Sequence, residues 1–249
     1  MSSENQGTMT LMPRTHKIRL TVLAALAAFV ATWAGTASAH VAGRAQTVQP
    51  TQRLAALLTT RMTFAKPTAS SAHRGVVQAV RPITEERTVL PVLAVNGDWL
   101  QVLLPGRPNG HTGWIKSQGT VTHYTSWHLV VQTSTPRVLV YHNGQVVKTF
   151  TAIVGKPSTP TPHGDFFVEE SIQLQSSDPG APFALALSAR STVFQEFDGG
   201  PGQVALHGLD NIGGNLGTAE SHGCVRLADS AIRWLVYRVG PGVPVTITS

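Results

Sequence analysis

The sequence contains a single cysteine, Cys224, among its 249 residues. An intramolecular disulfide is therefore excluded, and the thiol must serve packing, metal binding or thiol chemistry. His207, His222 and Cys224 are suitable zinc donors, but a structural zinc site needs a fourth ligand and usually a second cysteine. No phosphate-binding loop, coiled-coil heptad or internal repeat is visible either. We therefore expect no metal and no cofactor.

Acidic residues are also scarce, with 13 Asp and Glu against 19 Lys and Arg, a formal net charge of +6. Residues 40–84 hold six Lys or Arg and no acidic residue. This bias suits polyanionic surroundings such as a cell wall or lipid headgroups, although a solvated linker would have the same composition. The cations are dispersed and little interleaved with aromatic residues, which argues against a nucleic-acid partner.

Residues 1–39 have the pattern of a signal peptide. Three cations precede an almost wholly apolar run from Leu20 to Trp33, and the small residues Ala37, Ser38 and Ala39 fit a cleavage site before His40. We predict an exported protein of the cell wall or periplasmic space. Because the apolar run is shorter than the roughly 20 residues of a typical membrane span, an uncleaved membrane anchor is the less favoured alternative.

Residues 40–84 are predicted to be a basic linker with one short helix. Apolar residues at Leu54, Leu57, Leu58 and Met62 have helical spacing within residues 51–64. The run of Thr, Ala and Ser at residues 68–72 is typical of a flexible tether.

Residues 85–122 change to short β-type runs separated by turns. The stretch NGDWLQVLLPGRPNGHTGWI begins with Asn-Gly, a strong hairpin signal. It resembles the repeat of bacterial Src-homology-like small β-barrels, which implies a small β-barrel module here. Contacts with cell-wall polymers would then involve residues 40–122.

Residues 124–249 have the length of one domain. Alternating runs predict strands, Asn143-Gly144 predicts a tight turn, and the prolines of residues 155–164 predict a surface loop. One late helix is expected from Ser230 to Arg238, with Asp229 as its N-cap. The predicted class is therefore mainly β, with one late helix.

The segment from Ser221 to Arg226 reads Ser-His-Gly-Cys-Val-Arg. A thiol becomes a good nucleophile when a nearby imidazole removes its proton, and His207 or His222 could do so. The backbone N–H groups of Gly223 and Cys224 are candidates for an oxyanion hole. Arg226 is a permanent cation that could hold a substrate carboxylate. With these neighbours, we expect the pKa of Cys224 to lie below the ~8.5 of a free cysteine.

Three stretches together resemble the L,D-transpeptidase catalytic domain of bacterial cell-wall enzymes: VYHNGQVVKTFTAIVGKPSTPTPHGDF, VALHG and SHGCVRL. The resemblance implies a β-sandwich. It also implies that Cys224 is the nucleophile and His207 the base, with the carbonyl of Gly208 orienting the imidazole. The remaining implied site residues line the pocket: Ser221, His222, Gly223 and Arg226. Leu209 stands where relatives often have Thr, which leaves the hydrogen bonding after His207 open.

The family acts on peptidoglycan stem tetrapeptides. The resemblance implies that the acyl group of the third stem residue is taken from the terminal D-alanine and passed to the side-chain amine of a third residue on another stem. The alternative from another class is a non-catalytic wall-binding protein that uses the linker and the small module. A monomer is the favoured state.

Overall fold

The computed structural model describes residues 47–196 and 199–249 of the chain. The expected signal peptide lies outside these residues. Within the part that is described, no helix is long and apolar enough to cross a membrane.

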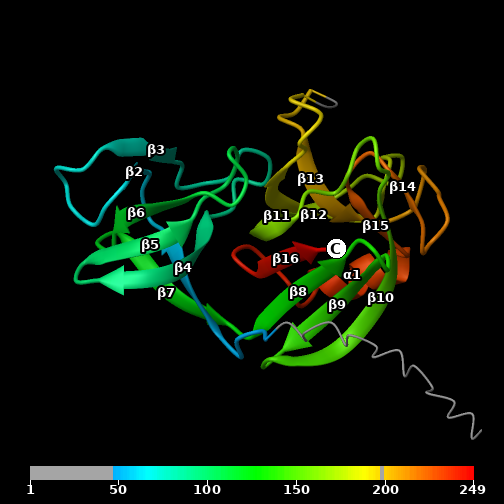
Figure 1. The fold of residues 1–249 in the computed structure, drawn as a ribbon, viewed down its shortest axis with the longest axis horizontal. Coiled ribbons are helices and arrows are strands. Elements are labelled where there is room, and N and C mark those ends of the chain that lie inside the picture. The colour runs from blue at the N-terminus through cyan, green and yellow to red at the C-terminus, as the bar shows by residue number, and fades with distance from the viewer. Residues whose placement is uncertain (1–46, 197–198) are drawn as a thin grey trace, which may run out of the picture. The chain divides into compact units, whose positions relative to one another are not determined.

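The first half of the described chain forms an antiparallel sheet of seven strands in the order β3-β2-β6-β5-β4-β1-β7 (Figure 1). Its strands are β1 Gln52–Leu57, β2 Arg61–Phe64, β3 His73–Val77, β4 Val89–Asn96, β5 Trp99–Leu103, β6 Thr112–Lys116 and β7 Thr120–Thr125. The Asn-Gly signal is confirmed as a hairpin, since Asn96 pairs with Trp99 across the turn. Identity with the Src-homology type of barrel stays a prediction.

The helix expected within residues 51–64 is wrong, because this stretch forms β1 and β2. Strand β1 lies between β4 and β7, and its four residues from Leu54 to Leu57 are all buried. A strand covered on both faces has a continuous apolar run, which periodicity cannot distinguish from a helix. The expected tether at residues 68–72 connects β2 to β3. Residues 52–77 are therefore part of the sheet and not a linker.

The second half forms a sheet of nine strands in the order β14-β10-β15-β13-β12-β11-β16-β8-β9. Its strands are β8 Trp127–Gln132, β9 Arg137–His142, β10 Gln145–Gly155, β11 Gly164–Gln173, β12 Phe183–Arg190, β13 Gln203–His207, β14 Ala219–Ser221, β15 Val225–Leu227 and β16 Pro244–Thr248. Strand β10 also pairs with β9, so eight of the strands close into a barrel. The mainly β class is confirmed, and the expected sandwich takes the form of a closed barrel.

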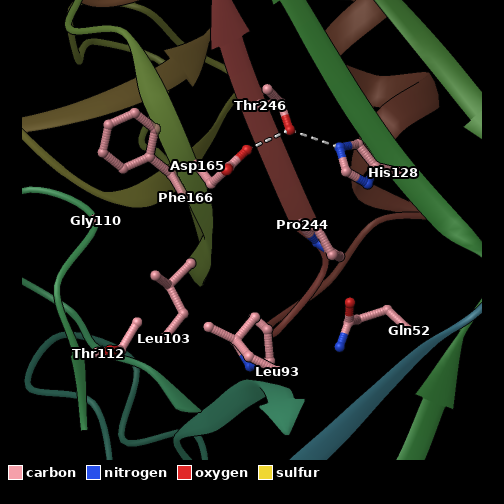
Figure 2. Close-up of a pocket in the computed structure, with 11 residues that line it drawn as sticks. Gln52, Leu93, Leu103, Gly110, Thr112, His128, Asp165, Phe166, Pro244 and Thr246 are labelled. Carbon is pink, nitrogen blue, oxygen red and sulfur yellow. Dashed lines mark hydrogen bonds between the residues drawn. The ribbon is translucent and has the colours of Figure 1, made fainter. Parts of the chain in front are cut away.

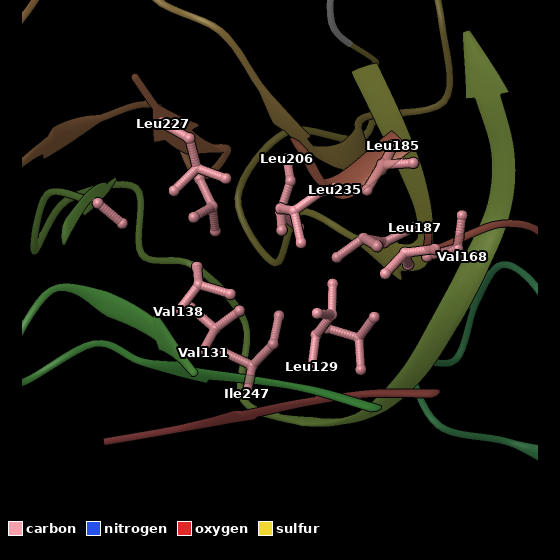
Figure 3. Close-up of a cluster of buried hydrophobic side chains, with 14 of the residues drawn as sticks. Leu129, Val131, Val138, Val168, Leu185, Leu187, Leu206, Leu227, Leu235 and Ile247 are labelled. Carbon is pink, nitrogen blue, oxygen red and sulfur yellow. The ribbon is translucent and has the colours of Figure 1, made fainter. Parts of the chain in front are cut away.

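Helix α1, Asp229–Val236, is the one helix of the described residues and confirms the expected late helix. Its Ile232 and Leu235 are fully buried in the barrel core, which Figure 3 shows with side chains from strands all round the barrel. Asp229 is not the N-cap as expected. It occupies the first turn, and the N-cap position is Ala228.

Strand β11 contributes to two cores. Phe166 belongs to the core of the barrel, whereas Phe167 belongs to the core of the seven-stranded sheet. Each is 1% exposed. Successive side chains of a strand point to opposite faces, so one strand can serve both.

A buried ionic network lies beside these phenylalanines. Arg81, from the segment between β3 and β4, pairs with Glu169 of β11, and Arg190 at the end of β12 donates to Glu169 at 3.0 Å. Glu170 accepts hydrogen bonds from the backbone N–H and the hydroxyl of Thr84, each at 3.0 Å. Burial lowers the pKa of Arg190 to about 10, which the nearby charge of Glu170 opposes. The network joins the seven-stranded sheet to the barrel.

We expect Arg81→Met to destabilise the protein by about 3 kcal/mol, because removing one partner leaves buried carboxylates undercompensated. Urea unfolding followed by tryptophan fluorescence measures the change. Arg74→Met, at an exposed cation of β3, is the matched control. Equal midpoints for the two variants would show that the network contributes nothing to stability.

Candidate active site around Cys224

The strands β13 and β15 run parallel and are direct neighbours (Figure 1). Leu206 pairs with Val225, and His207 pairs with Arg226. Leu206 and Val225 are fully buried in the barrel core, so the alternate residues His207 and Arg226 present their side chains on the other face. Cys224 immediately precedes β15, and a backbone hydrogen bond with Ala205 of β13 places it beside that strand. The pairing brings together His207 and Arg226, two of the expected site residues.

The imidazole of His207 is held in one tautomer. Its Nδ1–H donates to the carbonyl oxygen of Gly208 at 2.8 Å, as the resemblance implies. A carbonyl oxygen only accepts, so Nδ1 carries the proton and Nε2 the lone pair of the neutral ring. Gly180 packs against this ring, and a Cβ at that position would lie 2.3 Å from Nδ1 of His207. The sequence did not single out Gly180.

Asp229 fixes the chain after His207. Its Oδ1 accepts a hydrogen bond from the backbone N–H of Leu209 at 2.7 Å. A Cβ at Gly208 would lie 2.7 Å from the same oxygen and 2.0 Å from the carbonyl oxygen of Ala181. The hydrogen bonding that the sequence left open at Leu209 therefore uses its backbone, and the side chain at this position is not needed for it.

Ser221 organises the turn that carries the thiol. Its side chain is fully buried, and its Oγ–H donates to the carbonyl oxygen of Cys224 at 2.6 Å. The same Oγ accepts from the N–H of Gly223 at 3.1 Å. The expected oxyanion donor at Gly223 is thus already hydrogen-bonded in this state, which leaves the N–H of Cys224 as the remaining candidate. The φ of +122° at Gly223 requires glycine.

Two threonines that the sequence assigned to a surface loop support this turn. The Thr159 hydroxyl donates to the carbonyl of Ser221 at 3.1 Å, and the Thr161 hydroxyl donates to the carbonyl of Gly223 at 2.9 Å. Both side chains are buried, with 7% and 3% exposed. The expectation of a surface loop is therefore wrong for its threonines. The alternation of Thr and Pro in this loop could have indicated the buried threonines. Proline has no backbone N–H to donate, so the threonine hydroxyls are the donors that remain.

His222 is exposed, in contrast to His207. Its ring centroid lies 6.2 Å from that of Phe194. His222, Phe194 and Cys224 line a cavity of about 30 Å³, together with Ser191 and Gly202. The structure thus places the exposed His222 beside Cys224 in the lining of this cavity, whereas His207 is buried.

Arg226 is partly buried beside His207. Its Nη1–H donates to the carbonyl oxygen of Gly213 at 3.2 Å, and its Nε is buried without a hydrogen-bond partner. The guanidinium therefore still has donor capacity for an incoming oxygen ligand.

Burial shifts the ionisation of both Cys224 and His207. It raises the pKa of Cys224, and a backbone hydrogen bond with Ala205 and the charge of Arg226 only partly oppose the effect. Burial also lowers the pKa of His207. The hydrogen bond to Gly208 raises this pKa, and the positive charge of Arg226 lowers it further. Desolvation disfavours both charged forms. The expectation of a depressed cysteine pKa is contradicted, and the resting pair is a neutral thiol and a neutral imidazole.

Among residues 47–196 and 199–249, no group of three or more His, Cys, Asp or Glu side chains is arranged to hold a metal ion.

Residues 126–247 match the family model of the YkuD L,D-transpeptidase catalytic domain. This part of the chain belongs to the L,D-transpeptidase family. The match begins one residue before β8 and ends one residue before the end of β16, so it covers the barrel up to that last residue, together with the helix.

Curated relatives carry the same family name. L,D-transpeptidase 1 of Mycobacterium tuberculosis is 26% identical over 212 residues, which cover 71% of this chain and 78% of the relative. A YkuD protein of Bacillus subtilis is 27% identical over 149 residues, or 59% and 73% of the two chains. A solved structure of L,D-transpeptidase 3 from M. tuberculosis with a faropenem-derived adduct has a TM-score of 0.42 and 15% identity, over 65% of this chain and 91% of that one.

A second cavity, of about 310 Å³, lies away from Cys224. Figure 2 shows a hydrogen-bond chain at its edge, in which Thr246 donates from Oγ1 to Asp165 at 2.9 Å and bonds Nε2 of His128 at 2.9 Å. Burial lowers the pKa of His128, which Asp165 opposes. His128 lies in β8.

We expect alkylation of Cys224 in the resting L,D-transpeptidase to show a pH midpoint above the ~8.5 of a free cysteine. In Arg226→Gln the midpoint should rise further, because a positive charge favours the thiolate. Rates of iodoacetamide modification against pH measure both, and Arg226→Lys, which keeps the charge, should resemble the wild type. A wild-type midpoint below that of free cysteine would contradict the neutral resting pair.

Proposed function

We propose that the protein is a peptidoglycan L,D-transpeptidase that works through a thioester on Cys224. The observation that carries the proposal is that β13, which ends in a proton-accepting imidazole at His207, pairs with β15, which the single thiol of Cys224 immediately precedes. The family membership of residues 126–247 supplies the substrate class, peptidoglycan stem peptides.

In the first half-reaction, the sulfur of Cys224 attacks the carbonyl carbon of the third residue of a tetrapeptide stem. Nε2 of His207 accepts the thiol proton as the bond forms. The bond to the terminal D-alanine then breaks, and the imidazolium returns the proton to the leaving nitrogen. The N–H of Cys224 is the candidate donor to the oxyanion.

In the second half-reaction, the side-chain amine of a third residue on another stem attacks the thioester. His207 accepts a proton from this amine, and the thiolate leaves and is reprotonated from the imidazolium. A neutral thiol and a neutral imidazole at rest suit this order of steps, because the thiol gives up its proton only when an acyl group is in place to be attacked.

We also propose that the reaction takes place outside the cytoplasm. The support is the series of cations, apolar residues and small residues in positions 1–39, which fits an export signal. Binding of wall polymers by the basic N-terminal part remains a proposal of the same kind.

Mass spectrometry of the mature protein with a disaccharide tetrapeptide should detect a cross-linked dimer and the loss of D-alanine. His207→Ala should lower the rate by about 10²- to 10⁴-fold, the usual cost of losing a general base. The matched control is His222→Ala, which should be milder because His222 is exposed. A larger loss in His222→Ala would assign the base to that residue instead.

One equivalent of a carbapenem should add covalently to the intact wild-type protein. The strained lactam carbonyl would be attacked by Cys224 as the stem carbonyl is, and Arg226 could bind the carboxylate of the drug. Cys224→Ser should abolish or greatly slow the addition, since an alcohol is much harder to deprotonate. An equal adduct on Cys224→Ser in intact-protein mass spectrometry would overturn the assignment of the nucleophile.

A further inference from the structure

The segment that follows β12 forms one wall of the cavity beside Cys224. Ser191, Phe194 and Gly202 of this segment line the cavity, and Phe194 lies against the ring of His222. We call the described residues 191–196 and 199–202 the pocket wall. They belong to no strand or helix, so their shape depends on side-chain and turn hydrogen bonds.

Arg107 reaches the pocket wall from the segment between β5 and β6 of the seven-stranded sheet. Its Nη2 donates to the carbonyl oxygens of Ser191 and Phe194, each at 2.8 Å. Its Nη1 donates to the carbonyl oxygen of Pro201, also at 2.8 Å. One guanidinium therefore holds the two ends of the wall together. The planar fork of arginine presents several donors at fixed angles, which an ammonium group does not.

Asn109 fixes the point where the wall begins. Its Nδ2 donates to the carbonyl oxygen of Arg190 at 2.7 Å, and its Oδ1 accepts from the N–H of Arg190 at 2.8 Å. The side chain of Arg190 is itself paired with Glu169. Arg190, at the end of β12, is thus held by hydrogen bonds to its backbone and by the ion pair of its side chain.

Gly202 shows how closely the wall is packed. A Cβ there would lie 2.3 Å from the carbonyl oxygen of Phe194 and 3.4 Å from Nη2 of Arg107. The residue has a φ of +65°, which glycine adopts without strain. A side chain at this position would push the two ends of the wall apart.

We propose that Arg107 is a positioning residue for the transpeptidase reaction, by which the N-terminal sheet shapes the pocket that receives the acyl donor. The inference rests on the proposed function and deepens it. Arg107 bonds backbone carbonyls of the wall and acts through Phe194 and its neighbours, while β13 and β15 hold the thiol and the imidazole independently. The seven-stranded sheet is on this view a part of the active site.

The test compares Arg107→Ala, Arg107→Lys and Arg53→Ala in the mature full-length protein. Arg53 is the matched control, because its Nη2 bonds Thr122 within the same sheet. With the disaccharide tetrapeptide, Arg107→Ala should lower kcat/KM by about 10- to 100-fold, the scale expected for a displaced binding surface. Arg107→Lys should recover part of the loss, and Arg53→Ala should match the wild type. Alkylation of Cys224 by iodoacetamide should not fall in any of the three, because the wall is not needed for the thiol to react.

Gly202→Ala provides an independent route to the same disruption. It should reduce kcat/KM as Arg107→Ala does, and the double variant should lose less than the two single losses combined, since one wall is disturbed in both. Additive losses would overturn the inference. So would wild-type kcat/KM in Arg107→Ala, or a parallel loss of substrate turnover and iodoacetamide reactivity, which would mark a merely structural role.

Hydrogen exchange separates this inference from the proposed function. If the wild type releases no D-alanine, the proposed function fails. The amides of residues 191–196 then decide whether Arg107 positions the wall, because they should exchange faster in Arg107→Ala than in Arg53→Ala. Equal exchange in the two variants would overturn the positioning role.

Discussion

The alternation of side chains along β11 is the constraint on which the rest of the structure depends. Phe166 completes the core of the barrel and Phe167 the core of the seven-stranded sheet. A shift of one residue in register would place each ring on the wrong face and remove the largest buried side chains from both cores. Glu169 and Glu170 follow after Val168, and their carboxylates bond Arg81 and Thr84 of the segment between β3 and β4. The two sheets are therefore joined both by the packing of these phenylalanines and by the buried ion pair and hydrogen bonds beside them.

The chemistry of the site follows from its place on the barrel. His207 ends β13 and Cys224 immediately precedes β15. Leu206 and Val225 of these neighbouring parallel strands lie in the core, so both residues have a rigid support. Burial raises the pKa of the thiol and lowers the pKa of the imidazole. The positive charge of Arg226 lowers both pKa values, because it favours the thiolate of Cys224 and disfavours the imidazolium of His207. A resting ion pair of thiolate and imidazolium would lose solvation free energy on burial, and one nearby cation does not offset that loss.

The sequence indicates the residues of the candidate site more directly than it indicates the strand pairing. Cys224, His207 and the carbonyl of Gly208 could be named because a thiol, an imidazole and their motifs are local signals. The helix at residues 51–64 was wrong because β1 is buried on both faces and loses its period of two. The closure of the barrel could not be predicted, since it depends on β10 pairing with both β9 and β15. The raised pKa of Cys224 was missed for a similar reason, because burial is a property of the folded surroundings.

The pocket around the thiol is shaped mainly by hydrogen bonds between side chains and backbone groups. Thr161 donates to the turn before Cys224, Asp229 accepts from the loop after His207, and Arg107 donates to the pocket wall. Such bonds specify where a backbone runs without requiring a particular side chain on it. The surface offered to substrate can therefore vary in its side chains while its course stays fixed. Precision in an active site requires this kind of support, because a loop held only by its own turns would vary in position by more than acyl transfer tolerates.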